Sequence, residues 1–331
     1  MPATILDVAK LCGYSKATVS RAFVSPERVA EKTREKIYKA AQQLDYTPDA
    51  IARAMVRGRT DNIGFIIYEK QYPVVLTPFY SPIFESVLQT CVQKGYSLFI
   101  ASDSDLRLPN GQCCVKKQLD GVILAGHSDE RLVSDLRRHN MSVVLLNNSL
   151  DMEDLICVTT DQYGGAVLAM EHLVGRGHRR IGLIAGNFSP HVYLSRYKGY
   201  CDVLKNNGME VDPGLVYTIE PTVEQAIDCT NRLLSMKERP TALFCTNATI
   251  AIGAMKAALR AGLRIPEDIA VVGYDDSENS RLIEPELTTV RVDKAGMGRI
   301  AAERLIALIE EEEPKKEIIT TSVELVVRRS S

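Results

Sequence analysis

Residues 4–23 are the most informative stretch of the chain, and they read Thr4-Ile-Leu-Asp-Val-Ala-Lys-Leu-Cys-Gly-Tyr-Ser-Lys-Ala-Thr-Val-Ser-Arg-Ala-Phe23. Thr4 precedes an apolar stripe at helical spacing, so we expect it to cap a first helix that ends near residue 11. Gly13 can adopt the positive φ of a tight turn. Ser15 then precedes a second stripe of apolar residues. Two short helices joined by a glycine turn predict a helix-turn-helix.

A third amphipathic segment completes this unit. It begins at about Glu31 and should end before Tyr46-Thr-Pro48, because a residue that precedes proline avoids the helical region. With the apolar side of the second helix turned inward, its outer face presents Lys16, Ala17, Ser20 and Arg21. This short basic face suits the major groove of DNA. Arg21 can donate two hydrogen bonds to a guanine edge, and the hydroxyls of Thr4, Thr18 and Ser20 can reach phosphates. A three-helix packing module with an idle charged face is the alternative.

Charge is divided unevenly along the 331 residues, although the net charge is only −2. Residues 1–60 carry 11 Lys and Arg against 6 Asp and Glu, a net charge of +5. The other residues carry 29 against 36, a net charge of −7. We therefore expect only the basic head to meet a polyanion such as DNA, with a solvated lysine-rich helix face as the alternative.

The rest of the composition indicates an ordinary globular chain, with 45% hydrophobic residues and room for about two domains and a small module. No stretch approaches the roughly 18 consecutive apolar residues of a membrane helix, and the N-terminal residues contain no signal segment. We expect no membrane association and a cytoplasmic, nucleoid-associated protein. The eight cysteines include no Cys-x-x-Cys pair, so no metal site is expected.

The head resembles the headpiece of the lactose-repressor (LacI/GalR) family of bacterial transcription regulators. The match covers residues 5–21, Thr33-Arg-Glu-Lys36 and Leu44-Asp-Tyr-Thr-Pro-Asp-Ala-Ile-Ala-Arg53, and it continues more loosely to the C-terminus. The resemblance implies that Lys16, Ala17 and Arg21 contact bases and that Thr4, Ser15 and Ser20 contact phosphates.

Two residues depart from the family pattern. Val24 stands where an asparagine that helps to hold the backbone is usual, which puts that contact in doubt. Ala30 stands where a capping serine is usual, which should weaken the start of the third helix by about 1 kcal/mol.

Residues 49–60 form the expected hinge between a headpiece of residues 1–48 and a core of residues 61–331. A helix this short is marginal in water and should need a partner to form. The resemblance implies that two hinges pair in the minor groove, that Met55 is inserted between base steps where leucine is more usual, and that Arg53, Arg57 and Arg59 lie along phosphates. An inert linker is the alternative.

The core alternates apolar runs with segments of helical period. The runs are at 63–68, 96–101, 121–125, 143–146, 180–185, 241–245 and 268–273, with a last strand expected at 318–327. The expected helices are at 82–94, 128–139, 162–176, 191–208, 222–236, 247–262 and 293–312. This order predicts an α/β fold of two parallel sheets on either side of a cleft, as in periplasmic sugar-binding proteins. The resemblance implies subdomain crossovers near 160 and 290. Between 105 and 120 the chain is shorter than is usual in the family.

Polar side chains follow the expected strands, where ligands of parallel sheets bind. The resemblance implies that effector is contacted by Phe79, Tyr80, Arg196, Ile219, Asn247 and Asp275. An arginine opposed to Asp and Asn suits a neutral polyol, because such groups can bracket a pair of hydroxyls. Asp276 and Asn148 have a simpler alternative role as helix caps, and Asp161 as an anchor of the crossover.

Enzymatic motifs are weak. Gly296-Met-Gly298-Arg-Ile-Ala301 fits a dinucleotide-binding pattern, but Asp293 already starts a helix there, so the glycines should lie inside it. His178 should be a packing residue at a helix end. We therefore expect neither an enzyme nor a cofactor.

The sequence thus predicts a homodimeric repressor of the LacI family that binds a palindromic operator and is controlled by a sugar-like effector in the core. The helix at 82–94 should form the dimer contact through an apolar flank of Ile83, Val87, Leu88 and Cys91. A global catabolite-type regulator controlled by a protein partner, and a solute-binding protein without a regulatory role, are the alternatives.

Overall fold

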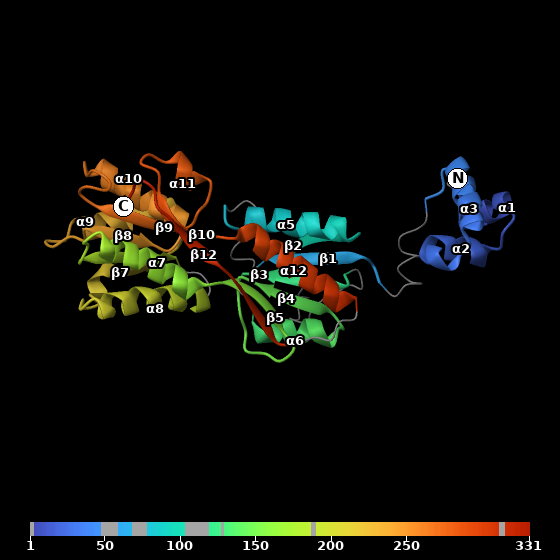
Figure 1. Ribbon diagram of the computed structural model, residues 1–331, viewed down its shortest axis with the longest axis horizontal. Helices are drawn as coiled ribbons and strands as arrows, with labels where there is room; N and C mark the ends of the chain where they lie inside the picture. The colour runs from blue at the N-terminus through green and yellow to red at the C-terminus, as the bar shows by residue number, and fades with distance from the viewer. Residues whose placement is uncertain are drawn as a thin grey trace.

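The computed structural model describes residues 3–47, 59–67, 78–102, 119–126, 129–186, 190–310 and 315–331 (Figure 1). The N-terminal headpiece consists of α1 (Ile5–Cys12), α2 (Lys16–Val24), the short 3₁₀ helix η1 (Pro26–Arg28) and α3 (Glu31–Gln43). These helices enclose a small core in which Val8, Val19, Ala22 and Ile37 are fully buried.

The three helices, the glycine turn and the Ser15 cap predicted for the headpiece are confirmed. Gly13 ends α1 with a φ of 76°, and the Ser15 hydroxyl accepts a hydrogen bond from the backbone N–H of Thr18 at the start of α2. Ala30 precedes α3 without any side-chain capping bond, as the missing serine predicted. The helix is instead held by Tyr38, whose hydroxyl donates to the carbonyl of Ala22 over 3.0 Å.

The core has two halves, each built on a six-stranded sheet (Figure 1). The first half contains, in spatial order, β11 (Glu317–Thr321), β5 (Ile156–Thr160), β4 (Ser142–Leu146), β3 (Gly121–Ala125), β1 (Asn62–Ile67) and β2 (Ser97–Ser102), all parallel. Its helices are α5 (Tyr80–Gln93) and α12 (Lys294–Ile309), which pack together on one face, and α6 (Glu130–Arg138) on the other.

The second half contains, in spatial order, β12 (Val323–Val326), β10 (Thr288–Val292), β9 (Ala270–Asp275), β8 (Ala242–Cys245), β6 (Ile181–Gly186) and β7 (Val216–Ile219). All neighbours are parallel except β12, which runs antiparallel to β10. One face is covered by α7 (Gln162–Gly175) and α8 (Pro190–Asn206), and the other by α9 (Val223–Leu234) and α10 (Ala248–Arg260). Short helices η4 (Pro213–Leu215) and α11 (Asn279–Leu282) complete this half.

The chain passes between the two sheets three times, between β5 and α7, between β10 and α12, and between β11 and β12. The third passage corrects the sequence prediction of one strand over 318–327, because Ser322 separates two strands that belong to different sheets. Apolar alternation continues through Ser322 and therefore does not reveal the change of sheet.

Strands β5, β7 and β10 were not among the predicted runs, because two of them are rich in threonine. In β10, Thr288 and Thr289 are fully buried, and the Thr288 hydroxyl accepts from the backbone N–H of Arg328 over 2.9 Å. Buried hydroxyls with backbone partners can replace the expected apolar side chains.

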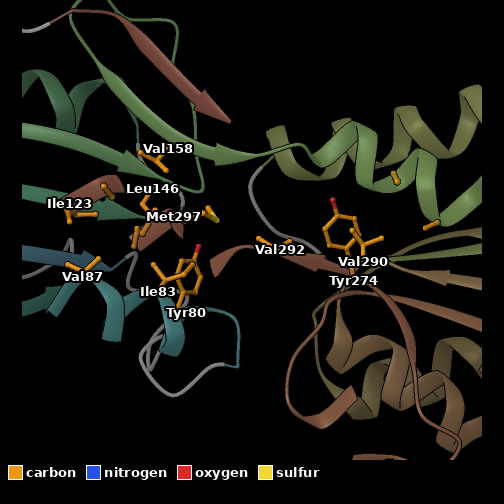
Figure 2. Packing of buried hydrophobic residues seen from close by; sticks show 14 of the residues in the cluster. Tyr80, Ile83, Val87, Ile123, Leu146, Val158, Tyr274, Val290, Val292 and Met297 are labelled. Atoms are coloured by element: carbon orange, nitrogen blue, oxygen red, sulfur yellow. The ribbon is translucent and has the colours of Figure 1, made fainter. Parts of the chain in front are cut away.

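Buried apolar side chains continue from one half of the core into the other. Figure 2 shows Tyr80, Ile83 and Val87 on one side and Tyr274 on the other, within one cluster of buried residues. Gly298 lies inside α12, as predicted, and a Cβ at this position would come within 2.3 Å of the Ile83 carbonyl oxygen. This glycine therefore serves the close packing of α12 on α5.

Within the described residues, no helix is long and apolar enough to cross a membrane.

Candidate nucleic-acid and ligand sites

The outer face of α2 is the candidate nucleic-acid interface. Lys16, Ala17 and Arg21 are exposed on this face, whereas Val19 and Ala22 on the opposite side are completely buried. Within the part of the chain that the structure describes, neither Lys16 nor Arg21 takes part in an ion pair. Both cations are therefore presented outward from a helix whose orientation is fixed by its own core.

Three of the hydroxyls predicted to contact phosphates, those of Thr4, Ser15 and Thr18, already have partners within the headpiece. Ser15 and Thr18 share a hydrogen bond of 2.9 Å between their hydroxyls, and the Thr4 hydroxyl donates to the Asp7 carboxylate over 2.7 Å. That contact holds the pKa of Asp7 below its ordinary value. Ser20 is half-buried. A phosphate only accepts hydrogen bonds, so the Thr4 hydroxyl and whichever of Ser15 and Thr18 donates to the other must turn their protons before they can bind one. Arg53, Met55 and Arg57 lie outside the described residues, whereas Arg59 lies within them.

Arg196 in α8 lies at the centre of the candidate ligand site, with 3% of its surface exposed. Its Nε donates to the side-chain oxygen of Gln162 over 2.7 Å, Nη1 donates to the carbonyl of Thr246, and Nη2 lies 3.4 Å from Oδ1 of Asp275. The guanidinium carbon lies 3.5 Å from the centre of the Tyr274 ring. The buried cation is therefore held by four protein groups.

The two adjacent carboxylates at the end of β9 differ in chemistry. Burial raises the pKa of Asp275, and Arg196 opposes this rise only in part. Burial also acts to raise the pKa of Asp276, but hydrogen bonds from Arg291 and Arg328 outweigh it and leave the value lowered. Asp276 is thus a structural anion rather than the helix cap considered from the sequence, whereas Asp275 has a weaker partner and suits ligand recognition.

Backbone geometry supports this arrangement. Asp275 and Asp276 have φ values of 84° and 41°, a left-handed conformation that is uncommon outside glycine. Both carbonyl oxygens accept hydrogen bonds from the ammonium group of Lys294 at the start of α12. Lys294 follows the second passage between the sheets, so it fastens the end of β9 to the first half.

Besides Asp275, the structure connects one more predicted ligand residue, Tyr80, to Arg196, and it does so through two residues that were not predicted as ligand contacts. The Tyr80 hydroxyl accepts from Nδ2 of Asn147 over 3.2 Å, and Oδ1 of Asn147 accepts from Nε2 of Gln162 over 3.3 Å. Asn147 directly follows the apolar run predicted at 143–146, where polar side chains were expected, whereas no pattern in the sequence indicated a role for Gln162. Its position directly after the predicted crossover near 160 was the available signal.

The other predicted ligand residues lie outside this set of contacts. Oδ1 of Asn247 caps α10 by accepting from the backbone N–H of Ile250 over 2.7 Å. Ile219 is the last residue of β7 and packs half-buried against the apolar cluster beside α9 and α10. Phe79 is half-buried, with its ring 4.9 Å from that of Tyr80. Asp161 caps α7 through the N–H of Gly164, which matches its alternative role as an anchor.

A cavity of about 500 Å³ opens beside Asp276, within the size range of small-molecule sites. It is lined by Pro82, Asp276, Arg281, Arg291, Val292, Asp293, Lys294, Ala295, Ser322, Val323 and Glu324. Two of the three passages between the sheets therefore border it. The sequence predicted none of these lining residues as ligand contacts.

His178 has the packing role that the sequence predicted. It lies at the end of α7, where its Nδ1 is 3.0 Å from the Thr241 hydroxyl. Burial, together with the neighbouring Arg176, lowers the pKa of His178. Most of the shortened segment between 105 and 120, residues 105–118, falls outside the described residues.

Comparison with known proteins locates two family matches in the chain. Residues 4–49 match the family described as bacterial regulatory proteins of the lacI family, and residues 170–331 match a periplasmic binding protein-like domain. The first match covers the helix-turn-helix and the second covers most of the second half of the core.

Whole-chain relatives agree with these matches. The chain is 32% identical over 333 residues to the HTH-type transcriptional repressor PurR of Mannheimia succiniciproducens, covering 99% of this chain and 98% of the relative. PurR of Pasteurella multocida is also 32% identical, over 335 residues with the same coverage.

Two solved structures show the same fold over the full length. The complex of the transcriptional regulator CelR with cellobiose is 30% identical with a TM-score of 0.75, covering 99% of this chain and all of CelR. The Lac repressor dimer bound to operator and the anti-inducer ONPF is 27% identical with a TM-score of 0.84, covering all of this chain and 99% of the repressor.

Proposed function

The chain belongs to the LacI family of bacterial regulatory proteins as a DNA-binding transcriptional repressor with a ligand-binding core, and from this premise we propose a specific mode of action. Two copies bind a palindromic operator, and a sugar-like small molecule in the core controls the affinity for DNA. Such a repressor acts in the cytoplasm, on the nucleoid. The observation that carries the proposal is the exposed basic face of α2 opposite a fully buried apolar face.

Operator recognition rests on Lys16, Ala17 and Arg21. An α-helix fits the width of a major groove, and the two cations on this one have no ion-pair partner among the described residues. Arginine can donate two parallel hydrogen bonds to guanine, the pairing that most often specifies a base. Phosphate contacts by Thr4, Ser15, Thr18 and Ser20 would fix the register of the headpiece without specifying sequence.

Dimerisation is supported by exposed apolar side chains on α5 and on the edge strand β2. Val92 is 64% exposed, Phe99 51%, Ile100 46% and Leu88 38%. Of the four apolar residues predicted to form the dimer contact on this helix, only Leu88 is exposed and available for it. Ile83, Val87 and Cys91 are fully buried against α12 and the first sheet. The proposed contact is therefore formed by the opposite side of α5 together with β2. Within the described residues β2 is the edge strand of its sheet, and covering these apolar side chains would also protect that edge.

The hinge of residues 49–60 completes the DNA-binding unit in this proposal. Met55 would insert between base steps in the minor groove, and Arg53 would follow the phosphates. Met55→Ala should weaken operator binding and leave the dimer intact, because the wedge contacts only DNA. Equal operator affinity for the two proteins would remove this role.

A neutral, hydroxyl-bearing effector fits the chemistry around Arg196 and Asp275. The contact between Asp275 and Arg196, at 3.4 Å, is longer than the hydrogen bonds from Arg196 to Gln162 and Thr246. Asp275 can therefore give up this contact and bind a ligand hydroxyl instead. Phe79, Tyr80, Ile219 and Asn247 are the further proposed contacts. The CelR structure similar to this chain contains cellobiose, which favours a sugar.

Thermal unfolding of the full-length protein with a panel of sugars, including cellobiose, and of purine bases tests this effector class. We expect at least one sugar to raise the unfolding temperature, because a ligand that binds only the folded state stabilises it. The same compound should then change operator affinity. A purine that alone gives both effects would contradict the sugar assignment. A panel without any stabilising compound would favour control by a protein partner.

A further inference from the structure

Gln162 connects polar groups from the two halves of the core. It is the first residue of α7, directly after the chain leaves the first sheet at β5, and it is 3% exposed. Its amide oxygen accepts from Arg196 of the second half over 2.7 Å. Its amide nitrogen donates to Asn147, which follows β4 of the first half, over 3.3 Å.

The direction of every hydrogen bond in this chain of contacts follows from the arginine. A guanidinium can only donate, so the oxygen of the Gln162 amide must face Arg196 and its nitrogen must face Asn147. The oxygen of Asn147 must then face Gln162, and its nitrogen must donate to the hydroxyl oxygen of Tyr80. The buried cation therefore determines which side-chain atom of each amide is the oxygen and which is the nitrogen, an assignment that the shape of an amide alone does not decide.

The residues at the two ends belong to different packed units. Tyr80 begins α5, which packs with α12 on the first sheet, and Arg196 lies in α8, which packs on α7 in the second half. Figure 2 shows Tyr80 among the residues of the first half, with Tyr274, whose ring Arg196 covers, across from it. Gln162 lies between these two units and contacts both.

We propose that Gln162 is a positioning residue that couples the ligand-recognition pair Arg196–Asp275 to Asn147 and Tyr80 in the other half of the core. A ligand oxygen that becomes an acceptor for Arg196 competes with Gln162, and release of the amide loosens its bond to Asn147. An acceptor-bearing neutral ligand is thus sensed as a change in the contact between the halves. This role rests on the proposed effector function of the site.

Amide hydrogen exchange of the full-length protein without any ligand tests the coupling, so its outcome does not depend on the identity of an effector. Gln162→Met keeps the length and volume of the side chain but removes both hydrogen bonds. We expect exchange to accelerate by roughly fivefold, as the loss of one buried hydrogen bond predicts, in both halves. The affected segments are residues 80–84 and 145–148 in the first half and residues 193–198 in the second.

Two further variants separate hydrogen bonding from packing. Gln162→Glu keeps an acceptor for Arg196 and can accept from the nitrogen of a rotated Asn147 amide, so it should restore exchange in the first half to near the wild-type rate. Gln225→Met, which removes a hydrogen bond within the second half only, should leave residues 80–84 and 145–148 unchanged.

Two results would overturn the proposal. One is a Gln162→Met protein in which exchange accelerates only around Arg196 while residues 80–84 and 145–148 keep their wild-type rates. The other is a Gln162→Glu protein that exchanges in the first half as fast as Gln162→Met. A ligand screen without any stabilising compound would count against the effector function, whereas the exchange pattern would still report on the contact between the halves.

Discussion

The headpiece and the centre of the core each contain a central arginine, which is exposed in the headpiece and buried in the core. Arg21 is held outward by a helix whose apolar side packs inside the headpiece, and it has no ion-pair partner among the described residues. Arg196 is buried and satisfied by Gln162, Thr246, Asp275 and the Tyr274 ring. The first arrangement leaves a cation available to a large external partner. The second stores a cation whose partners a small ligand must replace.

The largest effect is expected from removing the buried arginine. Arg196→Ala leaves Asp275 buried without its partner, so it should lower the free energy of unfolding by about 3–5 kcal/mol. Arg264→Ala removes an exposed pair with Asp268 and should cost less than about 1 kcal/mol. Urea unfolding of both proteins measures the difference. Equal losses for the two variants would show that Arg196 is not anchored as described.

Loss of the exposed arginine should act on DNA binding rather than on stability. Arg21→Ala should reduce affinity for the preferred operator by 10- to 100-fold, or about 1–3 kcal/mol, and relax the preference at one base-pair position. Lys39→Ala on α3 is the control with the same change of charge. The measurement is a titration of the operator and of its single-base variants at fixed salt. A uniform loss across all variants would make Arg21 a phosphate contact.

How far each region could be predicted from the sequence follows from how local its contacts are. The headpiece depends on neighbours within a few residues, such as Ser15 with Thr18 and Gly13 after α1, and these signals were sufficient. Most strands and helices of the core were also predicted from their periodicity. The change of sheet at Ser322 was not, because two strands of the same pattern continue across it.

The contacts of the ligand site were the part that the sequence predicted least. Arg196 and Asp275 are 79 residues apart, and Tyr80 and Asn147 are 67 apart. Strand ends placed Asn147 and Asp275 at the correct edge of their sheets, but pairing between elements required the folded arrangement. Gln162 was missed because a single glutamine at a helix start has no distinctive pattern.

A smaller effect tests the departure from the family at the start of α3. Ala30→Ser should supply the missing cap and stabilise the headpiece by about 1 kcal/mol, because Ala30 makes no side-chain bond to the helix. Slower amide exchange in α3 of the full-length protein would show this gain. Lys36→Ser, in the exposed middle of the same helix, should give no gain. Stabilisation by both substitutions would contradict the capping explanation.

The smallest effect concerns pH. Burial lowers the pKa values of His172 and His178 below 6.5, so each is neutral in the folded protein where the unfolded chain begins to bind a proton. Their contribution to stability is complete above about pH 6.5 and is lost as the pH falls through the lowered values. His178→Gln should therefore reduce the loss of stability on acidification. A thermal unfolding series from pH 7.5 to 5 measures it, and an unchanged slope would contradict the shift.

Selection of bound duplexes from a random library by the full-length protein tests the central claim most directly. We predict enrichment of a symmetric sequence with two half-sites, because the dyad of a dimer must match that of its operator. Binding to it should weaken steeply with added salt, as phosphate contacts require. Recovery of duplexes without symmetry, or of no preferred sequence at any salt concentration, would contradict the assignment of the outer face of α2 as the surface that reads DNA.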